Sequence, residues 1–212
     1  MKRILITIFF AFLLLPGVFG QDPVKKQYTA TRIIVPPAID GTLNDDAWKS
    51  GTWIDDFTQN EPYSGRPASQ RTEFNILFDD NNLYVAIKAY DTSPDSIVNR
   101  LTRRDEADGD LVGIIVDSYH DLRTGFLFGV SSAGVKYDQM FTGDGQNQDS
   151  SWDPNWWVET SINKEGWVAE MRIPFSQVRF DKNSGDGWGL EIARILYRKN
   201  ETSFWQHIPK DA

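Results

Sequence analysis

Apolar and polar side chains alternate with a period of two along most of this chain. The alternation runs from Thr72 to Phe78 and again from Leu83 to Ala89, with the turn-forming residues 79–82 between the two runs. Successive side chains of a strand point to opposite faces of a sheet, so this period indicates strands that bury one face. The short Asp and Asn side chains of 79–82 bond to nearby backbone and favour a turn. We therefore predict a β-hairpin over these residues.

Similar patterns predict strands over most of the remaining chain. A second hairpin is predicted from Trp156–Ile162 through residues 163–166 to Trp167–Ile173. Helical signals are brief and predict single turns that begin within 44–48 and 93–97. The further strands are predicted at Tyr28–Val35, Leu111–Ser118, Thr124–Val130, Val135–Met140, Trp188–Tyr197 and Ser203–Ile208. About eight to ten short strands in total predict an all-β fold, a two-sheet antiparallel β-sandwich with one or two short helices.

The first residues of the chain have the pattern of an export signal. Lys2 and Arg3 precede an apolar run from Ile4 to Leu15, and residues 16–20 then loosen the chain before a polar segment. The alternative is a membrane anchor, but the run is shorter than the roughly 20 residues of a spanning helix. We predict that residues 1–20 are a cleaved signal peptide, that 21–27 form a flexible leader and that 28–212 form one domain.

Composition excludes several kinds of chemistry. The 22 Lys and Arg fall to 20 when Lys2 and Arg3 leave with the signal, so the mature chain, with 30 Asp and Glu, has a net charge of −10. Such a surface repels phosphate backbones, and we expect no nucleic acid partner. The chain has no Cys and only two His, and it has no recognisable catalytic motif. These features favour a protein that is not an enzyme.

Tryptophans near the second hairpin are the candidate ligand-binding residues. Trp156 shares a predicted strand face with apolar residues and is expected in the core, whereas Trp157 shares the opposite face with Glu159. Trp152 lies in a polar loop. An indole on a polar face can stack on the C–H face of a sugar ring while neighbouring polar groups bond its hydroxyls. Trp152, Trp157, Glu159 and Arg104 are therefore candidate carbohydrate-binding residues, although packing by a loop or a partner explains such tryptophans equally well, and Arg104 could instead form a buried ion pair beside Asp105.

Two acidic loops supply hard oxygen ligands that could hold a structural Ca²⁺. Neither loop fits the twelve-residue calcium-binding pattern, and the default interpretation of each is a solvated loop. The candidate ligands are Asp105, Asp108, Asp110, Asp144 and Asp149.

Three segments, in order, resemble the family 9 carbohydrate-binding modules. They are residues 39–43 with Ala47 and Trp48 (the IDG-x-L…AW pattern), the hairpin 78–86, and 167–175 with its W-x-x-E-x-x-I-P-F pattern. The resemblance implies a β-sandwich that binds an oligo- or polysaccharide between tryptophans without catalysis, with calcium as a structural ion.

A narrower resemblance connects the chain with the periplasmic front domain of a Gram-negative outer-membrane protein family. It is carried by Arg104-Asp105, Asp117, Gly134, residues 151–153, 173–175 and Trp188-Gly189. It implies that the chain is a fragment of a longer protein, that a C-terminal outer-membrane β-barrel follows it, and that the domain lies at the periplasmic face of the outer membrane and serves polysaccharide binding or catabolism.

Two other functions remain open on this evidence. One is a rigid periplasmic interaction or gating domain for the attached barrel, with no sugar ligand. The other is a haem-binding domain of the related DOMON type, in which Met140 and His207 would ligate the iron.

Expression of the whole chain in a Gram-negative host is expected to yield a mature protein that begins at Gln21, because the peptidase reads the small residues at 16–20. Intact-mass analysis checks this. A Leu13→Arg control, which places a charge in the apolar run, is expected to stay uncleaved. A wild-type protein that keeps residues 1–20 contradicts the prediction.

Overall fold

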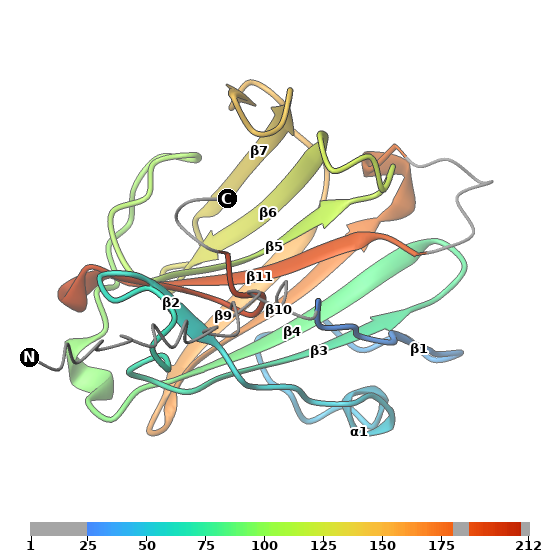
Figure 1. Ribbon diagram of the computed structural model, residues 1–212. Helices are drawn as coiled ribbons and strands as arrows, with labels where there is room; N and C mark the ends of the chain where they lie inside the picture. Colours follow the sequence, from blue (N-terminus) through green and yellow to red (C-terminus); the bar gives the residue numbers. More distant parts are fainter. Residues whose placement is uncertain (1–24, 180–186, 209–212) are drawn as a thin grey trace, which may run out of the picture.

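A computed structural model describes residues 25–179 and 187–208, which form two β-sheets packed face to face (Figure 1). The five-stranded sheet has the order β1-β3-β4-β10-β9, and the seven-stranded sheet has the order β2-β12-β11-β5-β6-β7-β8. The first comprises Thr31–Arg32 (β1), Thr72–Phe78 (β3), Asn82–Tyr90 (β4), Gly166–Pro174 (β10) and Trp157–Asn163 (β9); the second comprises Thr58–Glu61 (β2), Glu201–Phe204 (β12), Gly189–Leu196 (β11), Leu111–Asp117 (β5), Gly125–Ser131 (β6), Lys136–Thr142 (β7) and Asn147–Asp149 (β8). The predicted β-sandwich is confirmed.

Both predicted hairpins are present. β3 pairs with β4 and β9 pairs with β10, each in antiparallel register. The turn between β3 and β4 is closed by Asp79 Oδ1, which accepts hydrogen bonds from the backbone N–H groups of Asn81 and Asn82 at 2.7 Å each. Asn163 Oδ1 accepts from the backbone N–H of Glu165 at 2.8 Å in the other turn. Local turn chemistry therefore fixes the registers of these two pairs.

Helices are short, as predicted. The only α-helix of the described residues is the single turn α1 (Ala47–Ser50), which follows Asp46. The same parts of the chain contain three 3-10 turns, at Pro94–Ser96, Phe175–Gln177 and Tyr197–Lys199. No helix in the described parts of the chain has both the length and the apolar character needed to span a membrane.

The structure differs from the predicted strands at four places. The strand predicted at Tyr28–Val35 is reduced to β1, because Tyr28 packs into the core instead of extending the sheet, and β1 pairs parallel with β3. The strand predicted at Ser203–Ile208 is β12, which ends at Phe204 because the Gln206 side chain bonds to the backbone of Lys26 through two hydrogen bonds of 3.0 and 2.8 Å. The polar strands β2 and β8 lack an apolar alternation and were not predicted.

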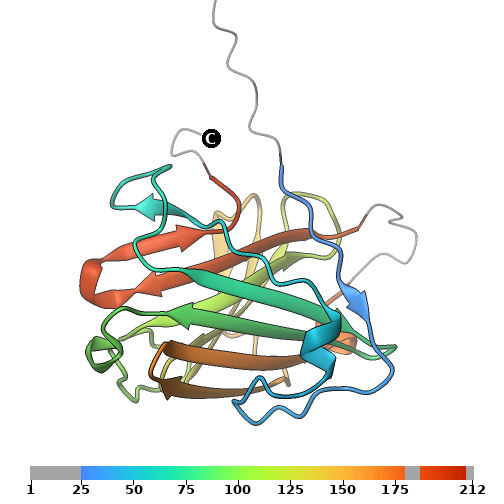
Figure 2. The same cartoon turned by 90° about the horizontal axis from the view of Figure 1, so that it is seen from below.

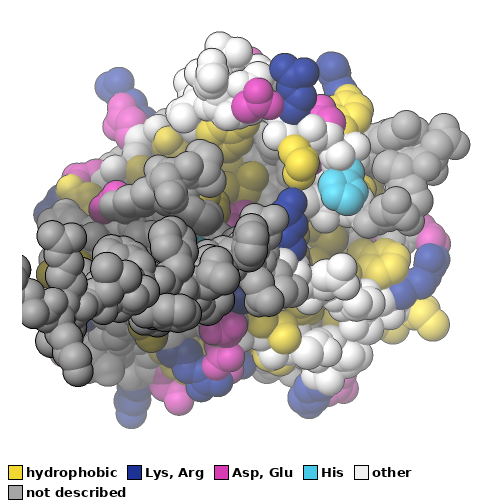
Figure 3. All heavy atoms as spheres, in the orientation of Figure 1, with side chains coloured by type: hydrophobic (Ala, Val, Ile, Leu, Met, Phe, Trp, Pro, Cys, Tyr) yellow, Lys and Arg dark blue, Asp and Glu magenta, His cyan; other side chains and the backbone are white. Residues whose placement is uncertain are grey.

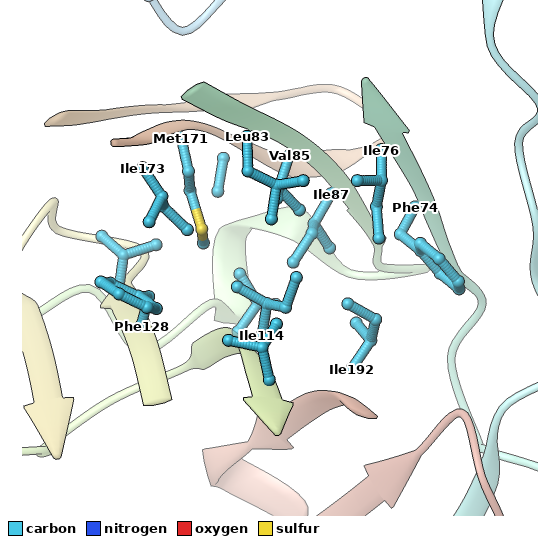
Figure 4. Packing of buried hydrophobic residues seen from close by; sticks show 14 of the residues in the cluster. Phe74, Ile76, Leu83, Val85, Ile87, Ile114, Phe128, Met171, Ile173 and Ile192 are labelled. Atoms are coloured by element: carbon cyan, nitrogen blue, oxygen red, sulfur yellow. The ribbon is translucent and has the colours of Figure 1, made fainter. Parts of the chain in front are cut away.

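The core lies between the sheets, where apolar side chains from both inner faces interlock (Figure 4). Phe74, Val85 and Met171 of the five-stranded sheet face Ile114, Phe128 and Ile192 of the seven-stranded sheet, and all six are fully buried. Burial of such side chains is the main favourable contribution to folding. It does not fix the orientation of the sheets by itself, since apolar contact has no direction.

One buried charge joins the two sheets at the end of this core. Arg194 of β11 is 1 % exposed, and burial lowers the pKa of its guanidinium to about 10. The guanidinium donates to the backbone oxygens of Arg71 and Tyr90 at 2.9 and 2.8 Å and to Thr72 Oγ1 at 3.1 Å. These acceptors belong to β3, β4 and the residue before β3. Directional bonds from one sheet therefore set the position of the other.

Gly166→Ala is expected to lower the free energy of unfolding by about 3 kcal/mol or more. Gly166 has φ +144°, and a Cβ atom there would lie 2.2 Å from the backbone oxygen of Ala89. The matched control is Gly145→Ala, where φ is +79° but nothing lies within 4 Å, so that only about 1 kcal/mol of backbone strain is expected. Urea denaturation measures both. Equal losses in the two variants would contradict the proposed steric clash.

Candidate functional site

The outer face of the five-stranded sheet is covered over part of its area by the segment 33–53. Figure 2 shows α1, which belongs to this segment, in front of the strands of this sheet. Ile33 and Trp48 pack there against Leu77, Tyr84 and Ala86 in a second apolar cluster, separate from the main core. The rest of this face, toward the edge strand β9, carries the exposed residues Trp157 and Glu159.

A buried carboxylate holds the covering segment in place. Glu170 of β10 is 0 % exposed, and burial raises the pKa of its carboxyl. Its Oε1 accepts from Trp48 Nε1 at 2.8 Å, and its Oε2 accepts from the backbone N–H groups of Gly41 and Asp40 at 2.7 and 3.1 Å. Ser161 Oγ donates to the backbone oxygen of Gly41 at 2.7 Å. The loop around Gly41 is thereby fixed on β9 and β10.

The loop approaches β9 so closely at Gly41 that a larger residue would be crowded there. The φ of Gly41 is +79°, and a Cβ atom would lie 3.3 Å from the carbonyl of Thr160. The positive φ of Gly41, within the 39–43 motif, is thus combined with a close approach to β9, a contact that local sequence does not reveal.

Trp157 and Arg172 form a stacked pair on the uncovered part of the face. We call these two residues, together with Glu159, the platform. Trp157 of β9 lies directly opposite Arg172 of β10, and the guanidinium carbon is 4.1 Å from the centre of the indole ring. Trp157 remains 42 % exposed, whereas Trp156 is fully buried. Glu159, two residues along the strand, is exposed on the same face. The predicted orientations of the two tryptophans are confirmed.

The structure does not bring the other two candidate sugar ligands, Trp152 and Arg104, to the platform. Trp152 is half-buried, and its ring centre lies 5.2 Å from that of Phe126 and 5.3 Å from that of Phe128. It therefore packs against the edge of the core. An indole held in this way offers less open surface to a ligand than Trp157 does.

Arg104 is engaged by acids that sequence reasoning did not pair with it. Its Nη2 atom lies 2.6 Å from Asp138 Oδ2 and 2.5 Å from Asp153 Oδ1. Asp138 is fully buried, which raises the pKa of its carboxyl, and it also accepts from Trp156 Nε1 at 2.6 Å. The ion pair considered for Arg104 therefore exists with Asp138 in place of its neighbour Asp105. The network joins the 103–106 loop to β7.

The five acids predicted as calcium ligands have separate partners. Residues 25–179 and 187–208 contain no group of three or more acids or histidines arranged to hold a metal ion. Figure 3 likewise shows acidic and basic side chains interspersed over the visible face. The partners are Asp138 N for Asp105, Arg100 for Asp108, Tyr197 N for the buried Asp110, Arg123 for Asp144 and Ser151 for Asp149.

The structure separates the two residues that the haem interpretation would use as iron ligands. Met140 lies on β7, whereas His207 follows β12, and three strands stand between β7 and β12 in the sheet. Four steps between neighbouring strands span about 19 Å, so these two side chains cannot ligate one iron.

A pocket of about 320 Å³ lies between the Gly41 loop and the turn that joins β9 and β10. Its lining includes Thr42, Lys88, Ser161, Asn163 and Val168. The Lys88 Nζ lies 3.9 Å from the centre of the Trp53 ring and 3.8 Å from Glu73 Oε2, so the cation is already held by protein groups. Sequence reasoning missed this pocket because the loop and the hairpin end that form it are far apart in the chain.

Comparison with known proteins supports the resemblance found in the motifs. Residues 39–203 match the family model for the carbohydrate family 9 binding domain-like proteins. A family 9 carbohydrate-binding module from Caldicellulosiruptor kristjanssonii in complex with glucose is 20% identical, with a TM-score of 0.59 over 85% of this chain and 90% of that chain. A module of the same family and organism in complex with cellotriose is 19% identical, with a TM-score of 0.57 over 85% and 84%.

A putative carbohydrate-binding protein from Bacteroides uniformis is 13% identical, with a TM-score of 0.65 over 87% of this chain and 91% of that chain. No curated protein matches the chain. At these identities the structural similarity shows a shared fold.

Glu170→Gln is expected to lower the free energy of unfolding by about 2–3 kcal/mol. The Gln amide has one acceptor oxygen in place of two. Its NH₂ group would therefore face an N–H group from which the carboxylate accepts a hydrogen bond in the wild type. Urea denaturation measures the loss, with Glu159→Gln as the control, because Glu159 lies directly opposite on β9 but is exposed. Unchanged stability in Glu170→Gln would contradict the role given to this carboxylate.

Proposed function

We propose that this chain, which belongs to the carbohydrate family 9 binding domain-like family, is a noncatalytic module that binds an oligo- or polysaccharide at the platform. The observation that carries the proposal is Trp157, an indole that is 42 % exposed on a sheet face and held by Arg172. The structural neighbours with bound glucose and cellotriose make glucose-based oligosaccharides a natural first set of ligands to test.

The platform has the groups that sugar recognition needs. The apolar C–H face of a pyranose ring packs on an indole, and carboxylates accept hydrogen bonds from its hydroxyls. Glu159 supplies such a carboxylate two residues from Trp157, on the same side of the sheet. Because both side chains are on a paired strand, little ordering of the protein is needed when a ligand binds.

The platform is poorly arranged for glycoside hydrolysis. Cleavage needs two carboxyl groups about 5–10 Å apart on either side of the bond. The nearest pair by register is Glu159 and Glu170, directly opposite one another on β9 and β10. Glu170 is buried and accepts three hydrogen bonds from the protein, so it is not free to act on a substrate. Binding without catalysis is the function that this geometry supports.

We also propose that the module is exported and acts at the periplasmic face of the outer membrane, as part of a longer polypeptide that ends in a β-barrel. The pattern of residues 1–20, which lie outside the described residues, and the motifs at 104–105 and 151–153 support this location. Fractionation of cells that express the protein from its natural gene tests it. Recovery of the mature protein in the cytoplasm alone would contradict the proposal.

Trp157→Ala is expected to weaken binding of an oligosaccharide at least tenfold, about 1.4 kcal/mol, because the stacking surface is lost. Isothermal titration against a panel of glucose-, xylose- and uronate-based oligosaccharides measures it. Ile162→Ala is the matched control, since Ile162 lies on the same strand with the same 42 % exposure. Trp152→Ala is expected to reduce stability more than affinity. A wild-type protein that binds no glycan, or a Trp157→Ala variant that binds equally well, would contradict the proposal.

A further inference from the structure

Arg172 differs from the other arginines that are buried or half-buried. Within the described residues these are Arg172, Arg194 and Arg198. Arg198 forms two bonds of 2.5 and 2.7 Å to Asp91, and Arg194 donates to three oxygens. No acceptor for the Arg172 guanidinium is found among the described residues, and its Nε atom is buried without a hydrogen-bond partner. The guanidinium stacks on the Trp157 ring, and on its other side Arg172 pairs in register with Tyr84 of β4.

An unpaired, half-buried guanidinium is a strong recognition group. Its charge cannot be removed near neutral pH, and its planar donors match the two oxygens of a carboxylate. Stacking on Trp157 holds the fork in one orientation, so less side-chain entropy is lost when a ligand binds. A partly desolvated donor that lacks an acceptor gains more from a new bond than an exposed one does.

Charges around the pair restrict where an anionic ligand can place its carboxylate. Glu159 is exposed on the same face, Glu170 lies on β10 two residues from Arg172, and Asp79 and Asp40 lie on neighbouring segments. All four are acidic, and Arg172 is the cation among them. A carboxylate is therefore attracted at the Arg172 fork and repelled elsewhere on the platform. The whole mature chain, at −10, also opposes densely charged polyanions at long range.

We propose that the Trp157–Arg172 pair selects a uronic acid residue, whose ring stacks on the indole while its carboxylate bonds to the guanidinium. Glu159 then accepts from a sugar hydroxyl. This inference rests on the proposed carbohydrate function and adds the chemical class of the ligand. The pair requires a ligand in which a carboxylate lies next to an apolar ring face.

The test compares matched ligands that differ only in charge. The mature protein, residues 21–212, is titrated with trisaccharides of galacturonic, mannuronic and guluronic acid, with the methyl ester of each, and with neutral cellotriose. We expect at least one acid to bind tenfold or more tightly than its own ester. Equal affinity for acid and ester in all three pairs, with measurable binding of any ligand, would overturn the uronate inference and leave the proposed function standing. No binding of any ligand would overturn both.

Variants of Arg172 distinguish the contribution of the paired guanidinium donors from that of the positive charge. Arg172→Gln is expected to bring the acid-to-ester ratio near one, and Arg172→Lys, which keeps a point charge, is expected to give an intermediate ratio. Arg32→Gln is the control, because Arg32 is exposed on β1 at the opposite edge of the same sheet and pairs with Asp80. Circular dichroism and thermal unfolding confirm that each variant is folded. A folded Arg172→Gln protein with the wild-type ratio would overturn the inference.

Discussion

The platform exists because one buried carboxylate, Glu170, fixes what covers the outer face of the five-stranded sheet. It binds the backbone at Asp40 and Gly41 and the indole of Trp48. An ionised carboxylate is costly to bury unless its oxygens are satisfied, and here three N–H groups satisfy them. The segment 33–53 is therefore fixed over one part of the sheet, and the strip with Trp157 is left to solvent. Arg194 has the same role inside the sandwich, where it sets one sheet against the other.

The positions of strands, and the sheet face to which each side chain points, could be predicted from the sequence where the information is local. β3 begins and ends where the period of two does, and the turn at Asp79 closes as its residue types predict. The opposite orientations of Trp156 and Trp157 also follow from that period. The parallel pairing of β1 could not be read, since alternation is the same for both strand directions, and β2 and β8 are too short and polar to stand out.

The contacts that build the site depend on residues far apart in the chain. Alternation along β10 assigns Glu170 and Arg172 to the same face, but it cannot show that the first is covered and the second is not. The motifs containing Asp40-Gly41 and Glu170 were recognised separately, and only the fold shows that they meet. Arg104 is a similar case, because its partner Asp138 lies 34 residues away on β7. Motif spacing identifies such residues without revealing their pairing.

The location of the platform on two hydrogen-bonded strands has a consequence for how finely ligands are distinguished. Loops can rearrange around several ligands, but strand pairing fixes the separation of the backbone positions that carry the indole and the guanidinium, and the two groups stack on one another. A binding surface of this kind works as a rigid template for stereochemistry. Epimers that turn one hydroxyl from equatorial to axial alter the flatness of the ring face, and a template that cannot adapt discriminates against them.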